Sequence, residues 1–179
     1  MTLIILDAGH GGNDPGATAN NLIEKQLTLN LTLRVQQKLI CREGFDVRLT
    51  RASDTFIGLS ERADFANQLD ADFFVSLHHN AGGGTGFESY VYPGTQDGET
   101  GRKQTIVHET VINFLSTFEL RDRGKKEANF AVIRETTMSA LLLENLFLDS
   151  NYDASLLKDP VFLDGLSDAI AKGIANVSL

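Results

Sequence analysis

A histidine set between glycines follows the first apolar run of the sequence. Residues 3–6 are all aliphatic, and soon after them His10 stands between Gly9 and Gly11. An apolar run too short for a helix and bounded by glycine is typical of a buried strand, and glycine lets the backbone turn sharply because it tolerates positive φ. We expect His10 at the end of a strand, at the edge where open α/β sheets bind ligands. A tight turn with an incidental histidine explains this segment alone equally well.

Two more histidines end another apolar run. Residues 72–79 are typical of a buried strand, and this strand closes on His78 and His79. Successive side chains of a strand point to opposite faces of its sheet. Only one of these two histidines can therefore face His10.

Two carboxylates complete the set of reactive groups. Glu144 interrupts the most apolar run, residues 140–148, where a buried charge costs several kcal/mol unless it is paired or neutralised. It is either half of a buried ion pair, for example with Arg134, or a catalytic carboxylate or metal ligand. Glu24 opens a helical period, where an acidic residue favours the helix dipole. Near His10, it is also a candidate ligand.

Together these groups fit a catalytic zinc site. Two histidines and one carboxylate, with a position left for water, are a known ligand set for such a site. Zinc lowers the pKa of its bound water and polarises a carbonyl, and another acidic group must then carry a proton to the leaving amine. The two histidines, Glu24 and Glu144 supply three ligands and one base.

The elements that position these residues alternate between strands and helices. Such alternation predicts an α/β fold in a single domain, with a mostly parallel sheet of about six strands flanked by helices on both faces. We expect 121–127 and 149–153 to be loops. Strands are expected at 3–6, 45–50, 72–79, 87–92, 130–133 and 140–148, and helices at 24–41, 60–69, 98–118 and 160–177.

The amino-acid composition argues against two classes of binding partner. The 179 residues include 24 acidic and 16 basic side chains, for a formal net charge of −8. This argues against nucleic acid and against anionic membrane surfaces, because both require clustered cations. No apolar run is long enough to span a bilayer. Met1 leads directly into the first strand, so we expect no signal peptide.

These residues resemble zinc-dependent N-acetylmuramoyl-L-alanine amidases of the amidase_3 type, including sporulation mother-cell-lysis amidases and related phage lysins. The resemblance covers nearly the whole chain, and its motifs are specific as an ordered set. They are residues 7–16 (DAGHGGNDPG), 24–25 (EK), 76–80 (SLHHN), 83–90 (GGTGFESY), 122–124 (DRG) and 143–145 (LEN).

The resemblance implies a zinc ion held by His10, Glu24 and His78, with Glu144 as the catalytic acid/base, in a catalytic domain spanning residues 1–179. It implies hydrolysis of the amide between N-acetylmuramic acid and L-alanine in bacterial peptidoglycan, on a twisted sheet. We expect a monomer that acts on the cell wall, either outside the cell or after release from the cytoplasm at lysis.

Some positions depart from the family pattern or allow two roles. Leu146 stands where relatives often have glycine, and Ser139 where they often have proline. Asn80 is expected to cap a turn rather than bind substrate. Asp7 either bonds a ligating histidine or caps a loop amide. Stem-peptide carboxylates suit guanidinium groups, but surface ion pairs are the expected role of the arginines considered, Arg51, Arg62 and Arg134.

Two rival functions remain open at this stage. One is a non-catalytic module that binds peptidoglycan or regulates its turnover, which the loss of a ligand or of Glu144 would favour. The other is a zinc peptidase that cuts within the stem peptide. A glycine-rich phosphate loop is disfavoured, because His10 interrupts the loop and no Lys or Thr follows at the required spacing.

Overall fold

A six-stranded sheet forms the centre of the molecule in a computed structural model that describes residues 1–177. The four strands that begin its order run parallel, β6 is antiparallel to β8, and β7 is parallel to β6. The predicted mostly parallel sheet is therefore confirmed. Its order is β4 (Phe45–Leu49), β1 (Thr2–Ala8), β5 (Phe73–Asn80), β8 (Ser139–Phe147), β6 (Phe87–Val91) and β7 (Asp122–Glu127).

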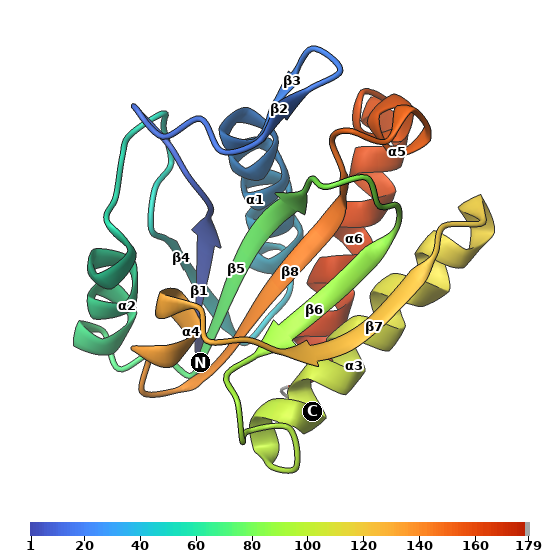
Figure 1. The fold of residues 1–179 in the computed structure, drawn as a ribbon. Helices are drawn as coiled ribbons and strands as arrows, with labels where there is room; N and C mark the ends of the chain where they lie inside the picture. Colours follow the sequence, from blue (N-terminus) through green and yellow to red (C-terminus); the bar gives the residue numbers. More distant parts are fainter. Residues whose placement is uncertain (178–179) are drawn as a thin grey trace.

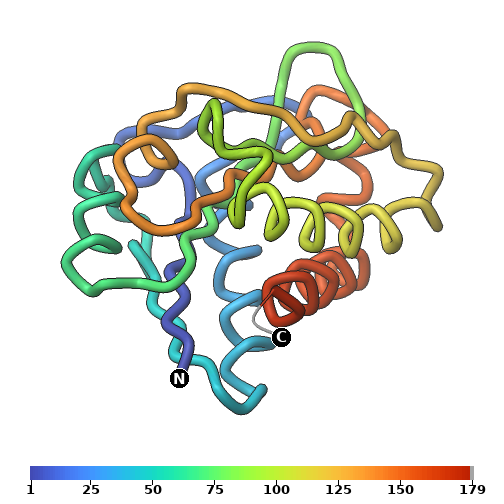
Figure 2. The backbone as a smooth tube through the Cα atoms, turned by 90° about the horizontal axis from the view of Figure 1, so that it is seen from below, coloured from blue at the N-terminus to red at the C-terminus, as the bar shows by residue number. Residues whose placement is uncertain are grey.

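Helices cover both faces of this sheet (Figures 1 and 2). On one face lie α1 (Glu24–Ile40), α3 (Glu99–Leu115) and α6 (Pro160–Asn176), and on the other lie α2 (Leu59–Gln68) and the short α4 (Ala131–Arg134). A 3₁₀ turn (Ser116–Phe118), α5 (Asn151–Leu157) and a hairpin of β2 (Thr18–Ala19) and β3 (Leu22–Ile23) complete the elements. None of the helices described is long and apolar enough to cross a lipid bilayer.

The core follows the alternation of the strands. Ile4 and Leu6 face the larger apolar cluster beneath α1, α3 and α6, whereas Ile5 and Phe74 face the smaller cluster beneath α2 and α4. Because the central strands are buried on both faces, their sequences are continuously apolar. A polar side chain on such a strand therefore stands out.

Three of the predicted segments differ from the structure. Residues 121–127, expected as a loop, contain β7, which pairs with β6 alone and so needs no apolar alternation. Residues 130–133, expected as a strand, lie at the start of α4, because so short an apolar run does not distinguish strand from helix. The predicted loop 149–153 runs into α5.

Candidate metal centre and catalytic carboxylate

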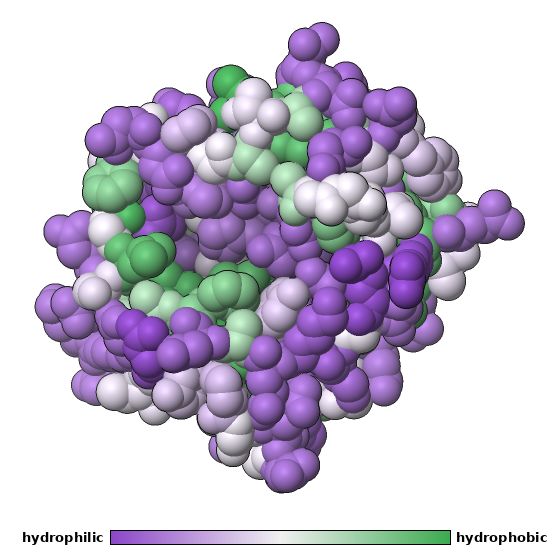
Figure 3. Space-filling model, viewed as in Figure 1, coloured by the Kyte–Doolittle hydropathy of each residue, from purple (hydrophilic) through white to green (hydrophobic). Residues whose placement is uncertain are grey.

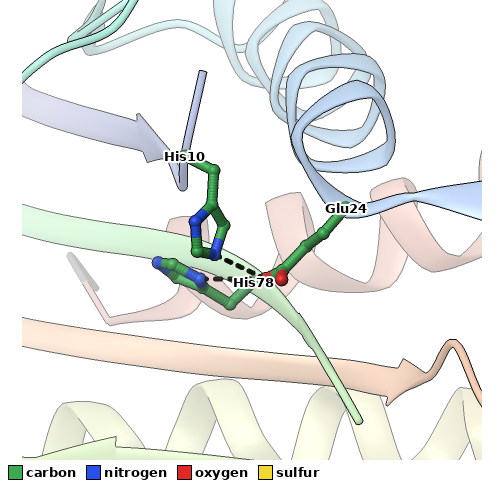
Figure 4. A group of neighbouring side chains, drawn as sticks. All are labelled: His10, Glu24 and His78. Carbon is green, nitrogen blue, oxygen red and sulfur yellow. Dashed lines mark hydrogen bonds and ion pairs between the residues drawn. The ribbon is translucent and has the colours of Figure 1, made fainter. Parts of the chain in front are cut away.

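Three potential metal ligands converge at the carboxyl edge of the sheet (Figure 4). His10 follows β1, Glu24 is the first residue of α1, and His78 lies near the end of β5. Glu24 Oε1 is 3.1 Å from His10 Nε2 and 3.1 Å from His78 Nδ1. The structure thus brings together the three ligands predicted from the sequence.

Glycines allow this close approach. A Cβ atom at Gly9 would lie 2.3 Å from the His78 ring, and one at Gly16 would lie 2.6 Å from Glu24 Oε2 and 2.7 Å from the His10 ring. Contacts this short do not occur between real side chains. The loop after β1 therefore needs glycine at both positions if the ligands are to meet.

Hydrogen bonds orient two of the three candidate ligands, His10 and Glu24. His10 Nδ1 lies 2.8 Å from Asp14 Oδ2, which leaves Nε2 directed at Glu24. The backbone N–H of Ala17 donates to Glu24 Oε2 at 2.8 Å. A carboxylate that bonds the second nitrogen of a ligating histidine fixes its tautomer and ring orientation. Asp14 was missed as a supporting residue, although its position four residues after His10 was a usable signal.

The charges of the three groups are coupled. Burial disfavours the charged form of Glu24, but hydrogen bonds from His10 and His78 outweigh burial and hold the pKa of this carboxyl well below its usual range. Burial also lowers the pKa of His10, but the hydrogen bonds and charges of Glu24 and Asp14 outweigh it and raise this pKa to about 9. Without a bound metal ion, these pKa shifts favour an ion pair in which His10 carries a proton.

The donor set fits zinc. Zinc bonds to histidine nitrogen and carboxylate oxygen are about 2.0–2.2 Å long, so neighbouring ligand atoms of a tetrahedral site lie roughly 3.3–3.5 Å apart. The separations of 3.1 Å from Glu24 to each histidine are close to this value. Two imidazoles and one carboxylate also leave a coordination position free for water.

Glu144 stands beside this centre on the neighbouring strand. It is the register partner of His78 across β5 and β8, and its Oε2 atom is buried with no hydrogen-bond partner among residues 1–177. Burial raises the pKa of Glu144 to about 7, with smaller contributions from nearby charges. Arg134 bonds Asn129 and Glu135 instead. The ion pair considered with Arg134 is therefore absent.

Two adjoining pockets open onto the centre. One, of about 400 Å³, is lined by Asn80, Phe130 and Glu144 as well as the three candidate ligands. The other, of about 360 Å³, is lined by apolar side chains such as Phe56 and Leu59 together with charged ones such as Asp14 and Arg62. Figure 3 shows the hollow, with hydrophobic residues gathered along its α2 and α4 side. A larger cavity of about 680 Å³ lies at the opposite, amino edge of the strands and contains none of the three ligands.

The sequence as a whole identifies the family. The sequence profile of Amidase_3, described as N-acetylmuramoyl-L-alanine amidase, matches residues 4–176. The chain belongs to this family. It is accordingly a hydrolase of the N-acetylmuramoyl-L-alanine amidase class, which cleaves the bond between N-acetylmuramic acid and L-alanine of peptidoglycan.

Relatives in the Amidase_3 family support this membership. The N-acetylmuramoyl-L-alanine amidase CwlM of Bacillus licheniformis is 47% identical over 177 residues, which is 98% of this chain and 68% of that protein. The endolysin of Bacillus phage SPP1 is 44% identical over 177 residues, which is 98% of this chain and 65% of the endolysin. The chain thus spans about two thirds of the length of these relatives.

A solved structure in the family has the same fold. The crystal structure of an N-acetylmuramoyl-L-alanine amidase from Clostridium difficile 630 superposes with a TM-score of 0.92 at 32% identity, and the match covers 98% of this chain and 95% of that one.

Two of the three arginines expected on the surface of this amidase, Arg51 and Arg62, are buried instead. Arg51 donates to the carbonyls of Ala8 and Gly9 at 2.9 and 2.8 Å, and Arg62 donates to those of Ala8 and His10 at 2.6 and 2.8 Å. The surface ion pairs predicted for both residues were wrong. Both arginines hold the loop that carries His10.

Asp7 has neither of its expected partners. Its carboxylate accepts hydrogen bonds from Thr50, Arg62 and Ser76, so it fixes Arg62 beneath the loop. Asn80 keeps its turn role in part, because its Oδ1 accepts from the Ala81 N–H while its Nδ2 donates to another carboxylate, Glu88.

His79 and Leu146 form a local irregularity behind the centre. His79 is buried, its Nδ1 bonds the Asn145 carbonyl, and burial lowers its pKa to about 4. The β5–β8 register shifts at this level, and Leu146 has a φ of +67°. Positive φ favours glycine, which is the residue that the family resemblance leads one to expect at this position.

Proposed function

We propose that this chain hydrolyses the amide between the lactyl group of N-acetylmuramic acid and L-alanine with a zinc ion held by His10, Glu24 and His78, and that residues 1–179 form the catalytic domain. The convergence of three candidate ligand atoms beside Glu144, whose buried Oε2 atom has no hydrogen-bond partner among residues 1–177, carries the proposal. Membership of the amidase family supports it.

A zinc ion held by these ligands supplies an activated water and polarises the scissile carbonyl. Glu144 acts as the general base and then as the general acid. Its carboxylate accepts a proton from the attacking water and passes that proton to the departing L-alanine nitrogen. A pKa near 7 suits both steps, because a catalytic group works best when its pKa lies near the working pH.

Mass spectrometry of digested muropeptides tests this proposal. Purified cell walls are incubated with the protein, with and without a chelator, and the newly exposed amine is identified. We expect new L-alanine amino termini that disappear with chelator and return when zinc is added back. A different new terminus would identify a peptidase that cuts within the stem peptide, and no cleavage would identify a non-catalytic binding module.

The oligomeric state and the site of action belong to the same proposal. We propose a monomer that acts on the cell wall and requires neither nucleic acid nor a membrane. Light scattering coupled to size-exclusion chromatography checks the first point, with a mass of 19.6 kDa expected for one chain.

A further inference from the structure

The polar edge strand β7 carries a β-bulge opposite Glu88. Phe87 pairs with Asp122 and Ser89 pairs with Lys125, so two residues of β7, Arg123 and Gly124, stand opposite the single residue Glu88. Gly124 has a φ of +89°, which allows the extra residue to fit. Normal alternation would send residues three apart to opposite faces. The bulge instead directs both Arg123 and Lys126 to Glu88.

Glu88 anchors Arg123 in one position. Its buried carboxylate accepts hydrogen bonds from Asn80 Nδ2 at 2.7 Å, from Tyr90 OH at 2.9 Å, from Arg123 Nε at 2.9 Å and from Lys126 Nζ. The Arg123 guanidinium also lies over the Phe147 ring, with Cζ 4.7 Å from the ring centroid. An anchored, stacked guanidinium loses little freedom when it binds an anion.

Two nitrogens of Arg123 remain available. Neither Nη1 nor Nη2 donates a hydrogen bond to any of residues 1–177, and the side chain is 25% exposed. Paired N–H groups of a guanidinium match the two oxygens of a carboxylate. Arg123 is therefore a preformed carboxylate-binding group.

Arg123 lies in line with the proposed catalytic groups across the sheet. His78 pairs with Glu144, Glu144 pairs with Glu88, and Glu88 bonds Arg123, on the adjacent strands β5, β8, β6 and β7. Neighbouring strands are about 4.8 Å apart, so β7 lies roughly 10 Å from β8. An extended peptide that starts at Glu144 covers this distance in about three residues, at ~3.3–3.6 Å each.

We propose that Arg123 binds a carboxylate on the second or third residue of the stem peptide. This inference rests on the proposed function, because Glu144 must face the leaving L-alanine nitrogen and so sets the side on which the peptide lies. The stem peptide then runs from Glu144 over Glu88 towards β7. The glycan lies on the other side of the metal centre, against the pocket that Phe56 and Leu59 line together with charged side chains.

Paired synthetic substrates test this assignment. N-acetylmuramoyl tripeptides with free carboxylates on residues two and three are compared with substrates in which one or both are carboxamides. We expect the parent protein to prefer the free acid at one of these positions by roughly ten- to hundredfold in kcat/KM. Arg123→Gln should lose this preference through a higher KM for the acid.

Control variants separate binding from folding. Lys125→Gln on the same strand removes a cation that bonds Thr105 on α3 and should keep the parental preference. Arg123→Gln leaves Glu88 with one cation fewer, so the double variant Glu88→Gln/Arg123→Gln removes the buried charge as well. It should fold, as judged by circular dichroism, and should also lack the acid preference.

Each contrary result has a distinct meaning. Equal losses on acid and amide substrates in Arg123→Gln would show that Arg123 only neutralises Glu88 and would overturn the assignment. A parent protein that cleaves acid and amide equally would overturn it as well. Failure to release any L-alanine-terminated peptide from either substrate would overturn the proposed function together with this inference.

Discussion

The two sides of the site are held in place in different ways. On the β1 side, buried arginines bond the backbone carbonyls of a glycine-rich loop, and that loop presents His10. On the β7 side, strand register sets the row from Glu144 to Glu88, and a bulge adds Arg123. The loop side depends on hydrogen bonds between distant segments, whereas the strand side depends on the sheet itself. The first should therefore be sensitive to single changes in its support.

The largest effect is expected at Glu144, where the two sides meet. Glu144→Gln removes the proton carrier, so we expect wall hydrolysis to fall by about 10²–10⁴-fold. Zinc content should stay at the parental level, because Glu144 is not a proposed ligand. The unfolding midpoint should not fall, since the variant removes a charge whose buried Oε2 atom has no hydrogen-bond partner in the described part of the chain. Turbidity assays, elemental analysis and thermal melts check these points, and parental activity would refute the assignment of Glu144.

The second largest effect is expected on the β1 side of the site, where Arg62 supports the loop that carries His10. Arg62→Ala leaves Asp7 as a buried charge without its cation and frees the His10 carbonyl, while the Ala8 carbonyl keeps its bond from Arg51. Breaking a buried ion pair costs about 3–5 kcal/mol in unfolding free energy. Urea unfolding measures the loss. A change on the strand side, Lys125→Gln, removes an exposed cation and should stay within about 0.5 kcal/mol. Equal losses in the two variants would contradict the contrast between the sides.

A smaller effect is expected from the support of His10. Asp14→Asn keeps the shape of the side chain but weakens its bond to His10 Nδ1. Loss of such a supporting carboxylate lowers metal affinity by about 10–100-fold. Competition with a chromogenic chelator measures this affinity. Unchanged zinc affinity would show that Asp14 only shapes the turn.

The smallest effect concerns how the stability of the protein depends on pH after a chelator has removed any bound metal. His10 has a raised pKa, so its stabilising contribution is complete below its ordinary value of 6.5 and is lost as pH rises towards about 9. Glu24 has a lowered pKa, so its contribution is present above its ordinary value of 4.5 and is lost as pH falls.

Thermal melts of chelator-treated protein check this dependence. The midpoint should fall by several degrees between pH 6.5 and 9. His10→Ala should show a smaller fall, because it lacks the titrating ring. Zinc-loaded protein should also show a smaller fall, since a ligating histidine is neutral. Identical pH profiles for the parent and His10→Ala would contradict the ion pair described for the metal-free centre.

The sequence predicted more of the candidate metal ligands and of the proposed catalytic carboxylate than of the residues that hold them in place. His10, His78 and Glu144 were recognisable because each follows or interrupts an apolar run, where a reactive side chain has little structural reason to be. Arg51 and Arg62 were not recognisable, because their sequence positions do not reveal that they turn inward to bond carbonyls far along the chain. Such contacts depend on tertiary packing and leave no periodic signal.

The strand side was harder to predict for a different reason. An edge strand has one neighbour, so β7 carries no apolar alternation and was predicted as a loop. The residues of α4 are apolar but too few to show a helical period. Arg123 could be recognised only as part of the motif at residues 122–124. Its proposed role depends on the bulge at Gly124, which becomes visible only when the register of β6 and β7 is known.

The bulge in β7 has a second consequence, for behaviour at high concentration. An open strand edge exposes unpaired N–H and C=O groups and can recruit a strand from another molecule. β7 is such an edge, but its bulge interrupts the regular spacing, and five of its six residues are charged. A second copy that approached edge to edge would meet charged side chains and a mismatched ladder. The feature that aims Arg123 therefore also protects the sheet from aggregation.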